Sequence, residues 1–171
     1  MVPRKARRYG IQEELKNWFS HSRKVVLAGI GNPIRRDDFV GVKVIEYLKG
    51  KTSEKVLLIE CETVPESFMQ QITDFDPTHV LLIDAAILEL KPGDSKLIDP
   101  EKLTSSPAFS THMLPLKIFC EYISQMTKAQ IALLLIQPKD TDFGEGMSPE
   151  LEASAQKISR ILLEALCSKN Q

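Results

Sequence analysis

Residues 25–38 of this 171-residue chain read VVLAGIGNPIRRDD and already indicate its fold class. The first six form an apolar run, rich in β-branched residues and closed by glycines, which is typical of a strand buried on both faces of a sheet. Residues 38–49 then place apolar side chains on one face of a helix that ends at Gly50. A buried strand followed at once by an amphipathic helix is the unit of α/β proteins.

The same alternation continues along the rest of the chain. Further strands are expected at 56–59, 79–84, 96–98 and 131–136. Helices are expected to begin at Pro65, near Pro115 and after Ser148, which is placed to cap the last of them. We therefore predict a single three-layer α/β domain over residues 25–171, with a mainly parallel twisted sheet and helices on both faces.

Composition excludes several classes of protein. The 22 Lys and Arg residues are balanced by 23 Asp and Glu, so the basic excess of a general nucleic-acid binder is absent. The longest purely aliphatic run, residues 131–136, is far shorter than the roughly 20 residues that span a bilayer, and no membrane insertion is expected. Cys61, Cys120 and Cys167 lie far apart, which predicts free thiols and a cytoplasmic protein.

Residues 1–24 form a basic N-terminal extension, with seven Lys and Arg against two Glu. This segment has no apolar stretch long enough for a signal peptide. Its apolar residues instead have the spacing of a short amphipathic helix: Ile11, Leu15, Trp18 and Phe19. The extension is interpreted either as an appendage packed on the domain or as an arm that docks a partner.

Ligands of open α/β sheets bind beyond the carboxyl ends of the strands, so the loop after residue 30 is the first place to search for a site. Gly29 and Gly31 begin like a dinucleotide-binding loop, but Ile34 stands where the third glycine is needed. The two acids at residues 37–38 would also repel a phosphate at the following helix. With no Walker A sequence in the chain, a nucleotide site is disfavoured.

Three polar side chains follow predicted strands or precede a helix at this same edge. Of the successive acids Asp37 and Asp38, one can be an ordinary helix cap, which leaves the other, taken to be Asp38, free to point into the crevice. Asp84 ends a strand, where a carboxylate beside aliphatic residues is costly unless a cation or a donor compensates it. His112 precedes the helix near Pro115. Each residue also has an ordinary structural interpretation, as a cap, a turn acid or a lone histidine.

Two carboxylates and one imidazole suit a divalent transition metal with positions left open for water or substrate. The chain has no HExxH motif of zinc peptidases, and the absence of thiolates from the set predicts weak, reversible metal binding. A Ser–His–Asp catalytic triad is not supported either, because the sequence has no G-x-S-x-G motif to carry a nucleophilic serine. A Cys–His pair of Cys61 and His112 stays open as an alternative.

An ordered series of motifs in this chain resembles a known family. The series comprises GIGNPIRRDDFVG at 29–41, VPE at 64–66, IDA at 83–85, TH at 111–112, PL at 115–116 and IQP at 136–138. It resembles the [NiFe]-hydrogenase maturation endopeptidases over about residues 25–165. The likeness is strongest to the HycI type, which processes the large subunit of the formate-hydrogenlyase hydrogenase. The extension at residues 1–24 departs from the family pattern.

The resemblance implies a peptidase that removes a C-terminal extension from the hydrogenase large-subunit precursor after nickel insertion. The metal-binding acids of the family fall on Asp38 and Asp84, and its histidine falls on His112; some members have Glu in place of Asp38. These three residues would bind nickel supplied by the precursor and align the scissile bond, so they are expected to be both metal ligands and catalytic residues. No tightly held metal is expected in the enzyme itself. A non-catalytic nickel-sensing assembly chaperone with the same three residues is the alternative.

Overall fold

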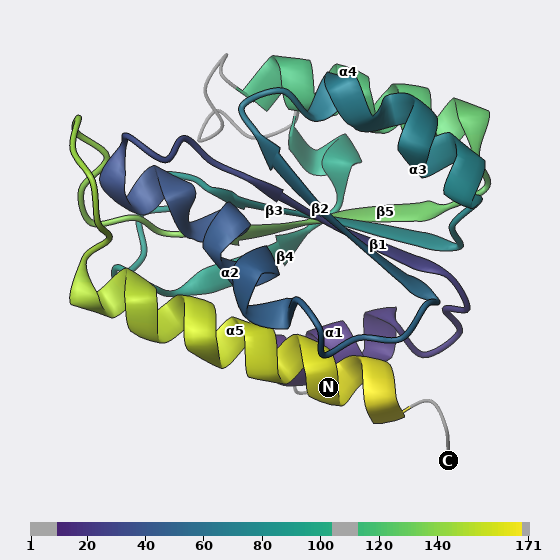
Figure 1. Cartoon of the computed structure of the whole chain (residues 1–171), viewed down its shortest axis with the longest axis horizontal. Coiled ribbons are helices and arrows are strands. Elements are labelled where there is room, and N and C mark those ends of the chain that lie inside the picture. Colours follow the sequence, from purple (N-terminus) through teal and green to yellow (C-terminus); the bar gives the residue numbers. More distant parts are fainter. Residues whose placement is uncertain (1–9, 104–112, 169–171) are drawn as a thin grey trace, which may run out of the picture.

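The computed structural model describes residues 10–103 and 113–168. In these residues helices mostly alternate with strands, and the short 3-10 helices η1, η2 and η3 lie between them (Figure 1). In chain order they are α1 (Ile11–Trp18), β1 (Val25–Ile30), η1 (Arg36–Phe39), α2 (Val40–Leu48), β2 (Val56–Glu62), η2 (Pro65–Phe68), α3 (Met69–Phe75), β3 (His79–Ala85), β4 (Ser95–Ile98), η3 (Pro100–Leu103), α4 (Leu114–Met126), β5 (Gln130–Ile136) and α5 (Pro149–Cys167).

The five strands form one sheet in the order β2-β1-β3-β5-β4. Strand β1 pairs in parallel with β2 and β3, and β3 pairs in parallel with β5. Only the edge strand β4 runs antiparallel, against β5. The central strands β1, β3 and β5 contain continuous, fully buried aliphatic runs because both faces of the sheet are covered. The predicted mainly parallel α/β sheet is therefore confirmed.

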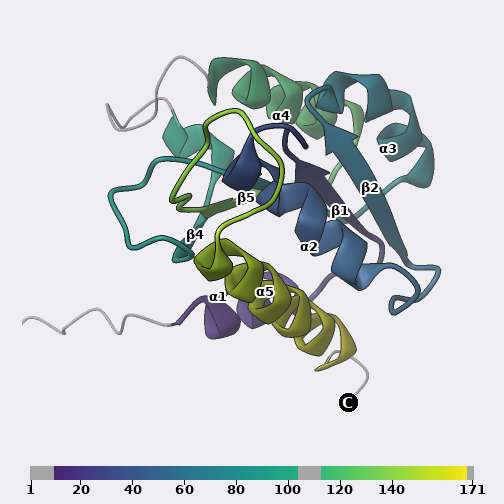
Figure 2. The ribbon, with the colours of Figure 1, turned by 60° about the vertical axis from the view of Figure 1, so that its left-hand side comes forward.

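Helices cover both faces of the sheet, so the domain has three layers (Figures 1 and 2). One face packs against α1, α2 and α5, and the other face packs against α3 and α4. Successive residues of a strand point to opposite faces. Leu27, Leu81 and Leu134 accordingly belong to the first core, whereas Val26, Leu82 and Leu133 belong to the second.

Helix α1, in the basic N-terminal extension, packs on the domain. Its Leu15 and the following Phe19 are completely buried in the core that also contains α2 and α5. Trp18 makes edge-to-face contacts with Phe19 and with His79 on β3, with ring centroids 4.8 and 4.9 Å apart. Residues 1–9 of the extension lie outside the described part of the chain.

Two helices begin differently from the sequence-based expectation. The helix predicted over residues 38–49 begins with the 3-10 turn η1, and only from Val40 does it continue as α-helix. The helix predicted from Pro65 likewise begins with η2 before α3. In the first case the backbone N–H of Asp37 donates to the carbonyl of Asp140, 3.0 Å away, so a distant loop determines how the helix starts.

No helix within residues 10–103 and 113–168 is long and apolar enough to cross a membrane.

Candidate functional site

Two carboxylates lie at the carboxyl edge of the sheet. Asp84 is the penultimate residue of β3, and its Oδ1 accepts a hydrogen bond from the backbone N–H of Ala85 at 2.8 Å. Asp38 lies in η1, after the loop that follows β1, and its Oδ2 accepts a hydrogen bond from the N–H of Asn32 at 3.0 Å. Both side chains are partly buried. The ends of neighbouring parallel strands thus bring together two acids that are 46 residues apart in sequence.

The two carboxylates interact electrostatically. Burial raises the pKa of Asp84 well above its ordinary value, and the negative charge of Asp38 raises it further. The hydrogen bond from Ala85 opposes these effects by favouring the charged form. Within the described residues, neither carboxylate forms an ion pair with Lys or Arg. Two neighbouring carboxylates, one of them with a raised pKa and both without a Lys or Arg partner among the described residues, form an arrangement that a bound cation would stabilise.

Replacing Asp84 by Asn is expected to stabilise the metal-free protein. The pKa of Asp84 is higher in the folded state than its ordinary value of 3.8, so wild-type stability falls as the pH rises from 3.8 through the folded-state pKa. Each unit of that elevation corresponds to about 1.4 kcal/mol. The variant should therefore have the larger free energy of unfolding at neutral pH, and the difference should disappear below pH 3.8. Urea denaturation at several pH values measures this; a variant that is less stable at neutral pH would contradict it.

Asp37, the neighbour of Asp38, has a different role. It is completely buried, and its two carboxylate oxygens accept four hydrogen bonds of 2.7–3.0 Å. The donors are the backbone N–H groups of Lys139, Asp140 and Ser148 and the hydroxyl of Ser148. Asp37 therefore fixes the loop between β5 and α5 against the turn that carries Asp38, and it leaves Asp38 as the acid of the pair that is partly exposed at the sheet edge.

The same contacts correct one sequence-based expectation. Ser148 occupies the N-cap position of α5, as predicted, but its side chain makes no capping hydrogen bond. Its hydroxyl donates to Asp37 instead, 2.9 Å away. The hydrogen bond that the hydroxyl donates to the buried carboxylate of Asp37 fixes the orientation of the Ser148 side chain, and in this orientation its oxygen accepts no bond from the first turn of α5.

Two glycines allow the elements of the site to approach closely. A Cβ atom on Gly31 would collide with the backbone carbonyl of Asp38, and one on Gly41 would collide with the carbonyl oxygens of Ile83 and Ile30. Neither glycine has a positive φ, so close backbone approach is what requires glycine here. The contact of Gly41 with Ile83 packs the start of α2 directly on the end of β3, next to Asp84.

The predicted third residue of the site, His112, lies outside the described residues. Helix α4, which begins at Leu114, leads into β5 at its far end, so its first turn lies at the carboxyl edge of the sheet. In the part of the chain that the structure describes, no group of three His, Cys, Asp or Glu side chains could hold a metal ion. Asp38 and Asp84 offer oxygen ligands that suit a divalent cation, but a third ligand has to come from elsewhere.

The three cysteines are free thiols, as the sequence predicts. Cys61, at the end of β2, is buried near the site, and burial raises the pKa of its thiol to about 12, with smaller contributions from the charges of Glu66 and Asp84. A thiol with this pKa stays protonated at neutral pH and is a poor nucleophile. The alternative of a Cys–His pair is therefore disfavoured.

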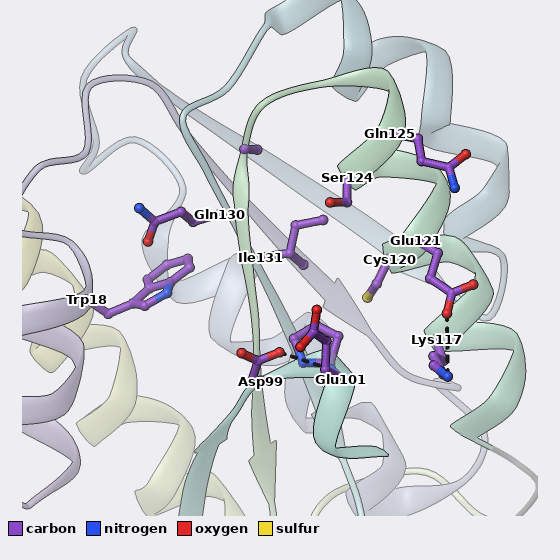
Figure 3. Close-up of a pocket in the computed structure, with 12 residues that line it drawn as sticks. Trp18, Asp99, Glu101, Lys117, Cys120, Glu121, Ser124, Gln125, Gln130 and Ile131 are labelled. Carbon is purple, nitrogen blue, oxygen red and sulfur yellow. Dashed lines mark hydrogen bonds and ion pairs between the residues drawn. The ribbon is translucent and has the colours of Figure 1, made fainter. Parts of the chain in front are cut away.

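The structure also has a cavity of about 560 Å³ that neither Asp38 nor Asp84 lines; Figure 3 shows its lining residues. It is bounded by Trp18, by η3, by the outer residues of α4 and by Gln130 at the start of β5. Its acids have local partners: Asp99 accepts a hydrogen bond from the N–H of Glu101 at 3.0 Å, and Lys117 pairs with Glu121 at 3.4 Å. Because parallel α/β sheets bind ligands at their carboxyl ends, we assign the site to Asp38 and Asp84 and not to this cavity.

Gln137 has a structural role near the carboxyl edge that the sequence did not show, although the residue belongs to the IQP motif. It is buried directly after β5, and its Oε1 accepts hydrogen bonds from the N–H groups of Leu88 and Leu90 at 2.6 and 3.4 Å. Its side-chain amide donates to the carbonyl of Pro138 at 3.0 Å. Gln137 thereby fixes the loop that follows Asp84.

Comparison with known proteins gives a consistent result. The model of the HycI hydrogenase maturation protease family matches residues 42–165, a range that contains Asp84 and His112 but not Asp38. A curated relative from Methanocaldococcus jannaschii, described provisionally as a hydrogenase maturation protease, is 34% identical over 164 residues, which cover 91% of this chain and 96% of the relative. The Hydrogenase 3 maturation protease of Escherichia coli K12 is 25% identical over 133 residues, which cover 78% and 85%.

Solved structures agree with this result. The crystal structure of the [NiFe] hydrogenase maturation protease HycI from Thermococcus kodakarensis KOD1 is similar to this chain with a TM-score of 0.84 and 35% sequence identity. The similarity covers 90% of this chain and 99% of that chain.

Proposed function

Because this chain belongs to the HycI family of hydrogenase maturation proteases, we propose that it removes the C-terminal extension of a [NiFe]-hydrogenase large-subunit precursor after nickel has been inserted. The observation that carries this proposal is the pair of acids Asp38 and Asp84. They lie at the ligand-binding edge of the sheet, and the charge of one raises the pKa of the other. A cation brought by the substrate would relieve that repulsion.

In this proposal Asp38, Asp84 and His112 bind the nickel ion that the precursor carries. Carboxylate oxygens and one imidazole nitrogen are hard and borderline ligands, so selectivity has to come from geometry and not from affinity alone. Because the precursor brings the nickel ion, the nickel is part of the substrate, and the enzyme needs no tightly held metal of its own. The free thiols are consistent with a reaction in the cytoplasm.

The described residues would act by positioning the bond to be cleaved. Asn32 orients Asp38 through a hydrogen bond, and Ala85 orients Asp84 in the same way. With Cys61 protonated, the attacking group is water, and a divalent cation nearby lowers the pKa of water and polarises the peptide carbonyl. Alignment of the scissile bond by the folded precursor would supply much of the rate.

The test is the mass of the precursor before and after incubation with the purified full-length protein. Nickel-loaded precursor is expected to lose its C-terminal extension, and nickel-free precursor is expected to keep it. Treatment of the enzyme with a chelator, followed by removal of the chelator, should leave its activity unchanged. Equal cleavage of both precursors would contradict nickel recognition, and binding of nickel-loaded precursor without any change in mass would instead indicate an assembly chaperone.

A further inference from the structure

Large hydrophobic side chains are exposed at only a few places in the described residues. Eight are exposed: Ile34, Val64, Ile87, Leu114, Ile118, Tyr122, Met126 and Phe143. Four of them lie on helix α4, spaced four residues apart. The other four lie on loops, and we call these four the apolar rim: Ile34, Val64, Ile87 and Phe143.

The apolar rim lies at the edge of the sheet that carries Asp38 and Asp84. Ile34 follows β1, Val64 follows β2, Ile87 follows β3 and Phe143 follows β5. Their exposed fractions are 51%, 43%, 65% and 70%. These four strands are parallel neighbours in the sheet, so one exposed apolar side chain follows the carboxyl end of each of them.

The opposite edge of the sheet provides an internal comparison. Its described connections are residues 19–24, 49–55, 76–78 and 127–129; none of the exposed large hydrophobic residues is among them, and at this edge only Met126, the last residue of α4, lies next to one of these connections. The loops at the carboxyl edge of the sheet therefore carry exposed large hydrophobic residues, whereas the described loops at the opposite edge carry none. Exposed apolar residues gathered on one side of a protein mark a surface that binds another molecule.

Hydrogen bonds and a ring contact hold the rim in place. The guanidinium of Arg35 lies 4.5 Å from the centre of the Phe143 ring, and the N–H of Gly144 donates to the carbonyl of Ile34 at 2.9 Å. The loop that carries Ile87 is fixed by Gln137 through the N–H of Leu88. Figure 1 shows the loop before α5 lying beside the start of α2. A preformed apolar surface binds without the cost of ordering its loops.

We propose that the apolar rim binds aliphatic or aromatic residues of the precursor on either side of the scissile bond. The proposal rests on the proposed function, because a peptide bond placed at Asp38 and Asp84 has to lie among the loops that carry the rim. The occupant is thus the precursor chain itself, and the rim recognises apolar side chains without contacting the nickel. Binding through the rim should accordingly be the same for nickel-loaded and nickel-free precursor.

The test uses Ile87→Asp and Phe143→Asp, with Met126→Asp as the matched control. Met126 is 57% exposed and ends α4, about 18 Å along the helix from its first turn at the carboxyl edge. Each rim variant is expected to raise the KM for nickel-loaded precursor about fivefold or more, the effect of losing one good interface contact. The control should keep the wild-type KM. All three side chains are exposed, so unfolding midpoints should change little.

A second measurement separates this proposal from the proposed function. The affinity of each variant for immobilised nickel-free precursor is measured directly, and the rim variants are expected to bind it more weakly by a similar factor. Wild-type KM and affinity in both rim variants, or an equal loss in the control, would overturn the proposal. If the wild-type protein cleaves no precursor, the proposed function fails, whereas the binding measurement still decides whether the rim is a docking surface.

Discussion

Replacing Asp38 by Ala is expected to reduce processing of nickel-loaded precursor by about a hundredfold or more, while the fold stays intact. Even residues that only support a metal ligand cost about 10- to 100-fold in activity when they are removed, and Asp38 is proposed to be a direct ligand. The side chain is partly exposed and, among the described residues, accepts one hydrogen bond, from the N–H of Asn32, so its loss should cost little stability. The same loss of processing is expected for Asp84→Ala and His112→Ala.

The rate of processing is read from the intact mass of the precursor over time, and folding is checked by circular dichroism and urea denaturation. Asp74→Asn serves as the control, since Asp74 is an exposed acid near the end of α3, at the opposite edge of the sheet. Normal processing by a variant would remove the substituted residue from the site. An equal loss in the Asp74 variant would show that the effect is one of overall charge.

The second large effect is expected on stability, from Gly41→Ser. Any Cβ at this position would overlap the carbonyl oxygens of Ile83 and Ile30, which belong to the hydrogen-bonded backbones of β3 and β1 and cannot move without disturbing the sheet. Overpacking of this kind costs about 3 kcal/mol. The helix that follows η1 would be pushed away from β3, so processing should fall as well.

Gly10→Ser is the matched control for this substitution. A Cβ on Gly10 has no atom within 4 Å, and serine is as well suited as glycine to the residue that precedes a helix. The urea midpoint of the Gly41 variant should therefore fall clearly, and that of the Gly10 variant should not. A Gly41→Ser protein with the midpoint and the activity of the wild type would show that α2 does not need this close approach.

The sequence predicted the strands, the layers and the edge where the site lies, because these follow from local patterns. Continuous aliphatic runs such as residues 25–30 can be buried only inside a covered parallel sheet, and the position of Asp84 at the end of such a run is visible in the sequence. The antiparallel direction of β4 was not predicted, since it depends on which neighbour the strand pairs with and not on its own four residues.

Long-range hydrogen bonds could not be predicted. The donors to Asp37 come from residues 139–148, more than 100 positions away, and they include the hydroxyl of Ser148, which does not cap α5. The N–H of Asp37, in the 3-10 turn, likewise bonds to the distant carbonyl of Asp140. The roles of Asp38, Asp84 and His112 stay predictions. For the first two the structure shows a shared location, where the charge of Asp38 raises the pKa of Asp84, and the third lies outside the described residues.

The hydrogen bonds of Asp37 also limit how the loop between β5 and α5 can vary in length. Surface loops usually tolerate insertions and deletions, because few of their backbone groups have fixed partners. Here both ends of the loop, at Lys139 and at Ser148, donate to one carboxylate, so a deletion would shorten a path that is fixed at both ends. Insertions are compatible with these bonds only between Asp140 and Ser148, where they would enlarge the surface next to Phe143. Variation in this loop among related proteins should therefore alter which precursor is recognised while leaving the two carboxylates in place.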